Sequence, residues 1–141
     1  MKIMICGSMA FAKEMIEAKK ELESLGHDVK IPTDAHEFAN NILDPDNFEA
    51  DYKHCIENDI IRTQFKLIEE SDAVLVLNHN KNGIQGYIGA ATLMELGLAH
   101  FLEKKIFLLN PLPDSSEERW AHEIRIFQPV VLGGVLEKID F

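Results

Sequence analysis

The chain has 141 residues, of which 46% are hydrophobic, and this length suits one domain built around one core. Its formal net charge of −10 argues against the basic surface that nucleic acids and anionic lipids require. We therefore expect a small molecule as the partner, and neither a nucleic acid polymer nor a membrane.

Cysteine content and the N-terminal sequence point to the compartment. The two cysteines, Cys6 and Cys55, form no C-x-x-C pair, and the apolar run in residues 1–8 is too short for an export signal. No segment approaches the roughly 20 apolar residues that span a bilayer. These features predict a reduced, cytoplasmic protein.

The N-terminal third reads as one βαβ unit. Residues 2–6 (KIMIC) form an apolar run that ends at Gly7, and residues 27–31 (HDVKI) form a second short strand. Between them lies a helical pattern that ends at Gly26. Its apolar positions are Phe11, Met15, Ala18, Leu22 and Leu25. The order strand, helix, strand is typical of a parallel sheet.

The middle of the chain is acidic first and helical afterwards. Residues 33–50, interrupted by Pro45, predict a long loop or a short helix over one end of the sheet. Residues 51–70 predict one helix of about five turns. The apolar side of that helix would consist of Ile56, Ile60, Ile61, Phe65 and Ile68.

The second half continues the alternation. Residues 73–77 (AVLVL) are continuously apolar, which is typical of a central parallel strand buried on both faces. A helix over residues 88–102 and a strand over residues 105–109 follow. Ser115 and Ser116 predict the N-cap of a helix that runs to about Ile126.

A short strand over residues 130–132 and a turn over residues 136–139 complete the chain. The pattern predicts a single α/β domain over residues 1–141 of the flavodoxin or Rossmann-like class. It would have about five mostly parallel strands with helices on both faces. In such sheets a ligand binds at the carboxyl ends of the strands, where the strand order reverses.

Two strand exits are rich in glycine and polar residues. Gly7, Ser8 and Met9 follow the first strand, and residues 78–89 follow the third. In a flavodoxin-like order both exits flank one crevice, and bare N–H groups at a helix start suit a phosphate. The glycine spacing matches neither the Walker motif nor the dinucleotide motif, so a different anion-binding loop is indicated.

The second exit contains most of the candidate binding residues. Lys81 offers a positive charge to a phosphate, and Tyr87 offers a wall to a sugar or base. The candidates in this segment are Asn78, Lys81, Gly83, Gly86, Tyr87, Gly89 and Thr92. The alternative reading is an ordinary flexible turn.

Glu95 is the candidate catalytic group. It lies between Met94 and Leu96, so a carboxylate stands among apolar neighbours on the helix that follows the loop. The alternative is a solvated helix acid paired with Lys104 or Lys105. The histidines show no metal-binding spacing, and the Asp44-x-Asp46 segment lacks the other ligands of a calcium loop, so we expect neither a metal nor a cofactor.

Four short segments carry a likeness to a known family. They are GS at 7–8, SDAV at 71–74, ELGLA at 95–99 and KKI at 104–106. Together they resemble the nucleoside 2-deoxyribosyltransferase family, which includes the deoxynucleoside 5′-monophosphate N-glycosidases, over most of the chain to about Pro113. The resemblance implies that Glu95 attacks the anomeric carbon of a ribosyl or deoxyribosyl group. The sugar would then pass to another base or to water, and a neighbouring subunit would complete the site in a homodimer or larger oligomer.

The chain departs from that family at two positions. Gln64 stands where many relatives carry an acid that handles the base, and Gly89 stands where relatives often carry an aspartate. The amide of Gln64 can donate and accept hydrogen bonds to a base edge, but it cannot act as a general acid. Arg62 is a second candidate near the base.

Two further readings stay open. The first is a phosphoribohydrolase like the cytokinin-activating enzymes, although GYIGAATLME does not match their P-G-G-x-G-T-x-x-E loop. The second is a non-catalytic nucleotide-binding sensor that kept the pocket and lost the acids. Release of free base distinguishes the two enzymes from the sensor.

Overall fold

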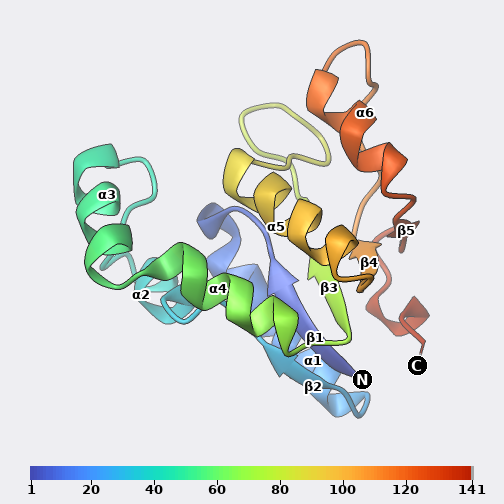
Figure 1. The fold of residues 1–141 in the computed structure, drawn as a ribbon, viewed down its shortest axis with the longest axis horizontal. Helices are drawn as coiled ribbons and strands as arrows, with labels where there is room; N and C mark the ends of the chain where they lie inside the picture. The colour runs from blue at the N-terminus through green and yellow to red at the C-terminus, as the bar shows by residue number, and fades with distance from the viewer. Residues whose placement is uncertain (141) are drawn as a thin grey trace.

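The computed structural model describes residues 1–140, and its centre is one five-stranded sheet (Figure 1). The strands are β1 (Lys2–Cys6), β2 (Asp28–Lys30), β3 (Ala73–Val76), β4 (Lys105–Leu108) and β5 (Val130–Val131). Their order is β2-β1-β3-β4-β5, and every neighbouring pair is parallel. The predicted α/β class and flavodoxin-like order are therefore confirmed. The strand order reverses between β1 and β3, and in sheets of this kind ligands bind at the carboxyl ends of the strands beside such a reversal.

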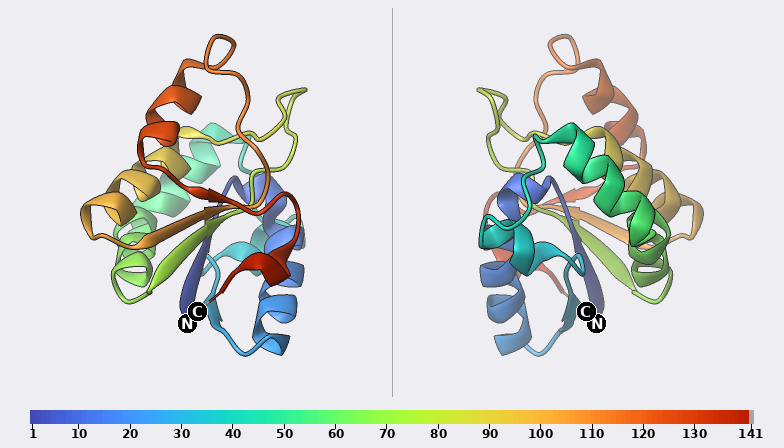
Figure 2. Two further views of the ribbon diagram at one scale, coloured as in Figure 1. Left: turned by 90° about the vertical axis from the view of Figure 1, so that its right-hand side faces the viewer. Right: turned by 90° about the vertical axis from the view of Figure 1, so that its left-hand side faces the viewer.

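Helices cover both faces of the sheet (Figure 2). One face carries α1 (Ala12–Ser24), which follows η1 (Met9–Phe11), and η2 (Leu136–Lys138). The other face carries α4 (Ile60–Glu69), α5 (Ala90–Phe101) and α6 (Arg119–Ile126). The remaining helices are α2 (Ala35–Ala39) and α3 (Phe48–Glu57).

The alternation of side chains along each strand divides the core into two clusters. Ile3, Ile5 and Leu75 face α1, and they pack with Met15 and Leu22 of that helix. Their strand neighbours face α4, α5 and α6. The members of this second cluster include Met4, Cys6, Ile68, Val74, Val76, Leu96 and Ile124. All residues of β3 are buried, as its continuously apolar sequence predicts for a central strand.

The prediction of one helix over residues 51–70 is wrong. The segment contains two helices, α3 and α4, because Asp59 adopts a left-handed conformation with φ of 47° between them. The Nδ2 group of Asn58 donates to the carbonyl oxygen of His54 at 2.9 Å and occupies an acceptor at the end of α3. Ile56 and Ile61 are consequently exposed, although the helical pattern predicted them on a buried side.

Two local predictions also need correction. The segment 33–50 contains α2 at its start and the first residues of α3 at its end. Ser115 and Ser116 do not cap α6, which begins at Arg119. Instead, the backbone N–H and the hydroxyl of Ser116 donate to Asp114 Oδ1 at 2.8 and 2.6 Å, and this local turn replaces the expected helix start.

Helix α3 projects from the body of the molecule (Figure 1). The structure describes all of its residues, and none is buried. His54 of α3 contacts Asp34, which precedes α2, with Nε2 and Oδ2 2.9 Å apart. The His54 ring also meets the Phe38 ring edge-on, with centroids 6.3 Å apart. Within residues 1–140, no helix has the length and apolar character needed to cross a bilayer.

Candidate active site

The exit of β1 brings the backbone close to the neighbouring strand. Gly7 has a φ of 151°, and a Cβ atom at this position would lie 3.1 Å from the carbonyl oxygen of Leu77. Ser8 follows as the N-cap of η1, and its Oγ accepts a hydrogen bond from the Ala10 N–H at 3.3 Å. Met9 is half-buried behind it. Ser8 therefore caps the 3-10 helix that leads into α1.

The two polar strand exits meet in space. Lys81, in the loop after β3, donates from Nζ to Ser8 Oγ at 3.2 Å. The same Nζ lies 5.2 Å from the centre of the Tyr87 ring, which is a cation–π distance. Within residues 1–140, Lys81 forms no ion pair with a carboxylate. The two loops therefore lie side by side, as the flavodoxin-like order predicts, and Lys81 contributes a cation without an acidic partner where they meet.

Glu95 lies on α5 and is half-buried. Its carboxylate lies near the thiol of Cys6, the last residue of β1. Burial raises the pKa of Glu95 from 4.5 to about 7, and the nearby Cys6 thiol opposes this increase. The carboxyl group of Glu95 therefore lies beside the end of β1, where burial shifts its pKa toward neutral pH.

Two other residues of the loop fix it to the sheet. The side chain of Asn78 is fully buried, donates to the carbonyl oxygen of Asn110 at 2.7 Å and accepts from the Asn110 N–H at 2.8 Å. Gly86 packs so closely on Pro111 that a Cβ atom would collide with the Pro111 carbonyl oxygen. Asn78 and Gly86 therefore hold the loop against the exit of β4, and the amide of Asn78 is already occupied.

The remaining loop candidates lie around the crevice in different roles. Gly83 is at the open tip, beside the bridge between Lys81 and Ile84. Gly89 is the N-cap residue of α5, and a Cβ atom there would lie 3.3 Å from the Tyr87 hydroxyl. Thr92 is buried within α5. These positions shape the helix start, where backbone N–H groups face outward.

Gln64 is the polar residue that α4 contributes to the buried side. It precedes Ile68 by one helical turn, and Ile68 belongs to the same cluster as Cys6. Gln64 is buried, and its Oε1 has no hydrogen-bond partner among residues 1–140. Arg62 is exposed and binds Asp59 at 2.6 Å, so it does not reach this region. Of the two candidates for contact with a base, Gln64 is the one that the fold buries.

The sequence reasoning missed three residues of this region. Cys6 lies near Glu95, His79 meets the Phe11 ring edge-on at 5.2 Å, and Trp120 meets the Tyr87 ring at 6.4 Å. The position of Cys6 immediately before Gly7 could have indicated its role, because the last side chain of a central strand lies at the crevice. Trp120 comes from α6, and no local pattern links it to the loop.

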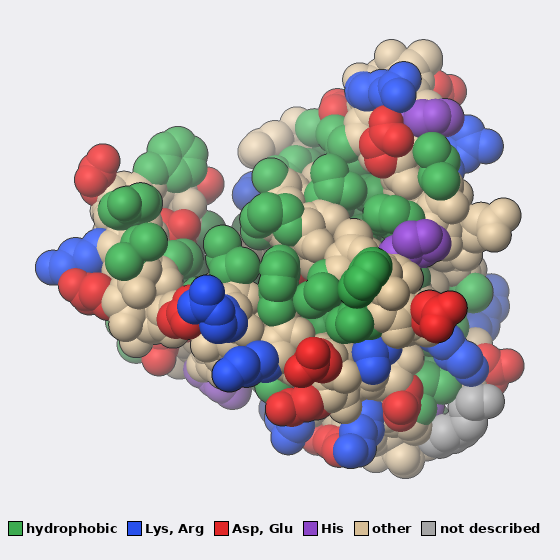
Figure 3. Space-filling view, viewed as in Figure 1, with side chains coloured by type: hydrophobic (Ala, Val, Ile, Leu, Met, Phe, Trp, Pro, Cys, Tyr) green, Lys and Arg blue, Asp and Glu red, His purple; other side chains and the backbone are tan. Residues whose placement is uncertain are grey.

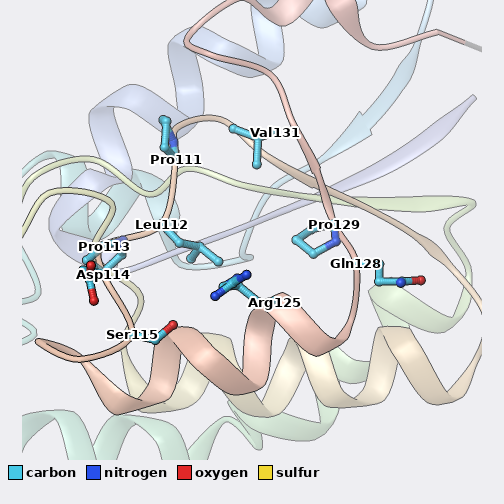
Figure 4. A pocket seen from close by; sticks show the side chains of 9 residues that line it. All are labelled: Pro111, Leu112, Pro113, Asp114, Ser115, Arg125, Gln128, Pro129 and Val131. Atoms are coloured by element: carbon cyan, nitrogen blue, oxygen red, sulfur yellow. The ribbon is translucent and has the colours of Figure 1, made fainter.

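A separate cavity of about 510 Å³ lies between the segment that follows β4 and the segment that leads from α6 into β5. Arg125 of α6 points toward the segment around Leu112 there (Figure 4). The wall of this cavity includes Pro111, which packs against Gly86, but not Glu95. The cavity therefore adjoins the loop between β3 and α5 and not the Glu95 carboxylate. Within residues 1–140, no cluster of three His, Cys, Asp or Glu side chains could hold a metal ion.

Comparison with known proteins shows the fold. No protein-family model and no curated protein matches the sequence. The structure is similar to the CMP N-glycosidase BcmB of Clostridium botulinum, with 22% identity, a TM-score of 0.50, and 94% of this chain and 84% of that chain covered. It is also similar to a 2-deoxyribosyltransferase from Leishmania mexicana, with 19% identity, a TM-score of 0.52, and 82% and 69% covered. The chain therefore has the fold of the nucleoside 2-deoxyribosyltransferase-like proteins.

Proposed function

We propose that the protein cleaves or transfers the N-glycosidic bond of a nucleoside or nucleoside 5′-monophosphate, as a member of the nucleoside 2-deoxyribosyltransferase family. The observation that carries this proposal is the half-buried Glu95 carboxyl beside the end of β1, the strand whose exit also meets Lys81 through Ser8. Both similar structures are of proteins named for this chemistry, and their fold supports the proposal.

In the proposed reaction, an oxygen of ionised Glu95 attacks C1′ of the sugar. The bond between C1′ and the base nitrogen breaks, and its electron pair leaves with the base, which takes a proton from water. A carboxylate suits this step because it stabilises the oxocarbenium-like transition state and then forms a covalent ester. Water or a second base next attacks C1′ and releases Glu95.

Gln64 would recognise the base. Its Oε1 has no partner among residues 1–140, and a buried carbonyl oxygen without a hydrogen bond is costly in free energy. An exocyclic amino group of a base supplies the missing donor. Because an amide carries no transferable proton, the leaving base is stabilised by hydrogen bonding rather than by general acid catalysis.

The loop between β3 and α5 would bind the 5′ end of the substrate. Lys81 and Ser8 approach each other from the two strand exits, and the first N–H groups of α5 follow Gly89. A phosphate accepts hydrogen bonds from such groups and is attracted by both the lysine and the helix dipole. A 5′-monophosphate would therefore gain affinity over the free nucleoside.

The working form would be a homodimer. On one face of the molecule, hydrophobic side chains gather over α3, α4 and α5 (Figure 3). The exposed large hydrophobic residues of these helices, which we call the outer apolar face, are Phe48, Tyr52, Ile56, Ile61, Met94 and Phe101. Phe48, Tyr52 and Ile56 are 78%, 68% and 65% exposed and recur every four residues along α3.

A second copy of the chain suits this face best. The three aromatic side chains among the six can each bury roughly 150–250 Å², so the face makes up much of the ~800 Å² per partner of a standard interface. Apolar patches of this size are rare on monomers. Since Met94 is adjacent to Glu95, the partner would lie close to the site and help to exclude water from it.

The test is incubation with a panel of nucleosides and their 5′-monophosphates, in ribo and deoxyribo forms, with free base measured by chromatography. We expect base release that falls at least 1,000-fold in Glu95→Gln, because the amide is not a nucleophile. Glu103→Gln is the matched control, because Glu103 is exposed just after α5. Adding a second base distinguishes transfer from hydrolysis.

Other outcomes identify the alternatives. Release confined to ribonucleoside 5′-monophosphates would favour the phosphoribohydrolase reading. Tight nucleotide binding without any release of free base, with the same affinity in Glu95→Gln, would overturn the proposal of an enzyme. The protein would then be a nucleotide-binding sensor.

A further inference from the structure

The cavity between the segment after β4 and the segment before β5 has no role in the proposed reaction. Its volume of about 510 Å³ lies in the range of small-molecule pockets. We call it the Arg125 cavity, after the cation in a wall that is otherwise largely apolar. The apolar members of the wall are Pro111, Leu112, Pro113, Pro129 and Val131. Because proline rings have little freedom to lose, this wall is suited to the apolar body of a ligand.

Arg125 brings a positive charge to the cavity. It lies on α6, and its side chain points toward Leu112 (Figure 4). The other two arginines, Arg62 and Arg119, each bind a nearby carboxylate. In the part of the chain that the structure describes, residues 1–140, Arg125 forms no ion pair. A guanidinium cannot lose its proton in a protein, so this charge persists and attracts an anion.

Asp114 is the acidic residue of the cavity wall, and its bonds go to Ser116. Its Oδ1 accepts from the Ser116 hydroxyl at 2.6 Å and from the Ser116 N–H at 2.8 Å. These hydrogen bonds are the main cause of the lowered pKa of Asp114, and the charge of Arg125 contributes less. Asp114 therefore leaves the guanidinium open to a carboxylate or phosphate from outside the chain.

Ser115 supplies a second polar group without a partner. Its hydroxyl oxygen is buried and forms no hydrogen bond with any of residues 1–140. A buried hydroxyl in this state costs free energy. Ser115 as a whole is half-buried and lines the cavity, and its oxygen points toward Arg125 (Figure 4). A rotation about its Cα–Cβ bond would bring the hydroxyl to an anion held by the guanidinium.

We propose that the Arg125 cavity binds a small organic anion, with its carboxylate or phosphate group on Arg125 and Ser115 and its apolar body against the prolines. A planar guanidinium donates two parallel hydrogen bonds to either anionic group, and the Ser115 hydroxyl can donate a third. Glu95 is not part of this wall. The anion site is therefore separate from the proposed reaction and does not depend on it.

The probes are benzoate and phenyl phosphate, each of which joins one anionic group to an apolar ring. Benzyl alcohol is the uncharged comparison, and isothermal titration calorimetry measures the affinities. We expect at least one of the two anions to bind at one site, about tenfold or more tightly than benzyl alcohol. The anion that binds more tightly identifies the carboxylate or the phosphate as the preferred group. Binding of neither anion, or equal binding of benzyl alcohol, would overturn the proposal.

Arg125→Gln and Arg119→Gln are a matched pair, because each removes one positive charge from α6. Arg119 binds Glu123 and lies outside the cavity wall. Arg125→Gln should weaken the tighter probe by about tenfold or more, whereas Arg119→Gln should leave its affinity unchanged. Lys81→Met should also leave it unchanged, since Lys81 lies on the loop between β3 and α5. Equal weakening in all three variants would show a response to net charge and would overturn the proposal.

Ser115→Ala tests the hydroxyl in two ways. Without a probe, the melting temperature should rise by roughly 2 °C or more, because an unpaired buried hydroxyl is removed. The affinity for the tighter probe should nevertheless fall by about threefold or more, because one donor to the anion is lost. An unchanged affinity would overturn the place of Ser115 in the site. None of these measurements uses base release, so a failure of the proposed function would not affect them.

Discussion

The crevice at β1 and β3 and the projecting helix α3 differ in how the fold supports them. At the crevice, a strand end, a helix and two loops converge, since Glu95 lies near Cys6 and Lys81 binds Ser8. Helix α3 has no buried residue, and its side-chain link to the body runs through His54. In the proposed homodimer, the chain would supply the sheet side of the site and the partner would cover the outer side.

The largest expected effect concerns the outer side. The double variant Tyr52→Lys, Ile56→Lys should weaken self-association by about 100-fold or more, since central interface residues each contribute about 2 kcal/mol. Because α3 buries no residue, the free energy of unfolding of the monomer should change by less than about 0.5 kcal/mol. Sedimentation velocity over a concentration series measures the association.

The matched control is Lys53→Gln, which changes an exposed residue of the same helix. It should leave association unchanged. A wild-type chain that stays monomeric at high concentration would contradict the homodimer. The exposure of the apolar side chains of α3 would then need another explanation.

The next effect concerns the sheet side. The folded pKa of Glu95 is about 7, above its ordinary value of 4.5, so its contribution to stability is full below pH 4.5 and is lost as pH rises through 7. Glu95→Gln should therefore stabilise the fold at pH 8 by on the order of 1–3 kcal/mol and have less effect at pH 5. Urea unfolding at both pH values measures this, and an effect independent of pH would contradict it.

The same titration governs the reaction. Since the nucleophile must be ionised, kcat/KM of the wild-type protein should rise with pH through about 7. A pH profile of base release measures the midpoint. A profile that is flat between pH 5.5 and 8 would mean that Glu95 is not the group that attacks the sugar.

The attachment of α3 gives a smaller effect. His54→Ala leaves the buried Asp34 without its ring partner, and Asp34 Oδ1 already has no hydrogen bond among residues 1–140. We expect a loss of about 2 kcal/mol and faster hydrogen exchange in α3, with slow exchange retained in β1 and β3. His36→Ala, at an exposed position of α2, is the control. Equal acceleration throughout the molecule would show that α3 is not separately attached.

The smallest effect concerns the loop. Lys81→Met should raise KM for a 5′-monophosphate by about tenfold and leave KM for the free nucleoside unchanged, because one charge-assisted hydrogen bond is lost. Lys66→Met, at an exposed position of α4, is the control. An equal increase in KM for both substrates would mean that Lys81 stabilises the loop and does not bind the phosphate.

The sequence predicts the sheet well because its signals are local. The apolar run of β3 and the glycine after β1 identify central strands, and the flavodoxin-like order then brings both loops together. The break between α3 and α4 escapes prediction because apolar residues continue at helical spacing through it. Helix α3 ends because Asp59 is left-handed and because the Asn58 side chain binds the His54 carbonyl oxygen. Neither feature changes the spacing of apolar residues from which helices are predicted.

The site is predictable in part for the same reason. Glu95 is conspicuous as the one acid of an apolar helix, and the loop residues follow a strand directly. It lies near Cys6, which is 89 positions away in sequence (95 less 6), and the roles of Asn110 and Trp120 likewise depend on packing between distant elements. No spacing rule along the chain reveals these contacts.

The pair of Asn78 and Asn110 has a consequence for how substrate enters. Their reciprocal hydrogen bonds and the contact of Gly86 with Pro111 anchor the loop at two points, and the tip around Lys81 and Gly83 is held through the bond of Lys81 to Ser8. In the proposed reaction, breaking that one bond would let the tip move without disturbing the strands below it. We therefore expect product to leave past the tip while Glu95 stays in place for the next turnover.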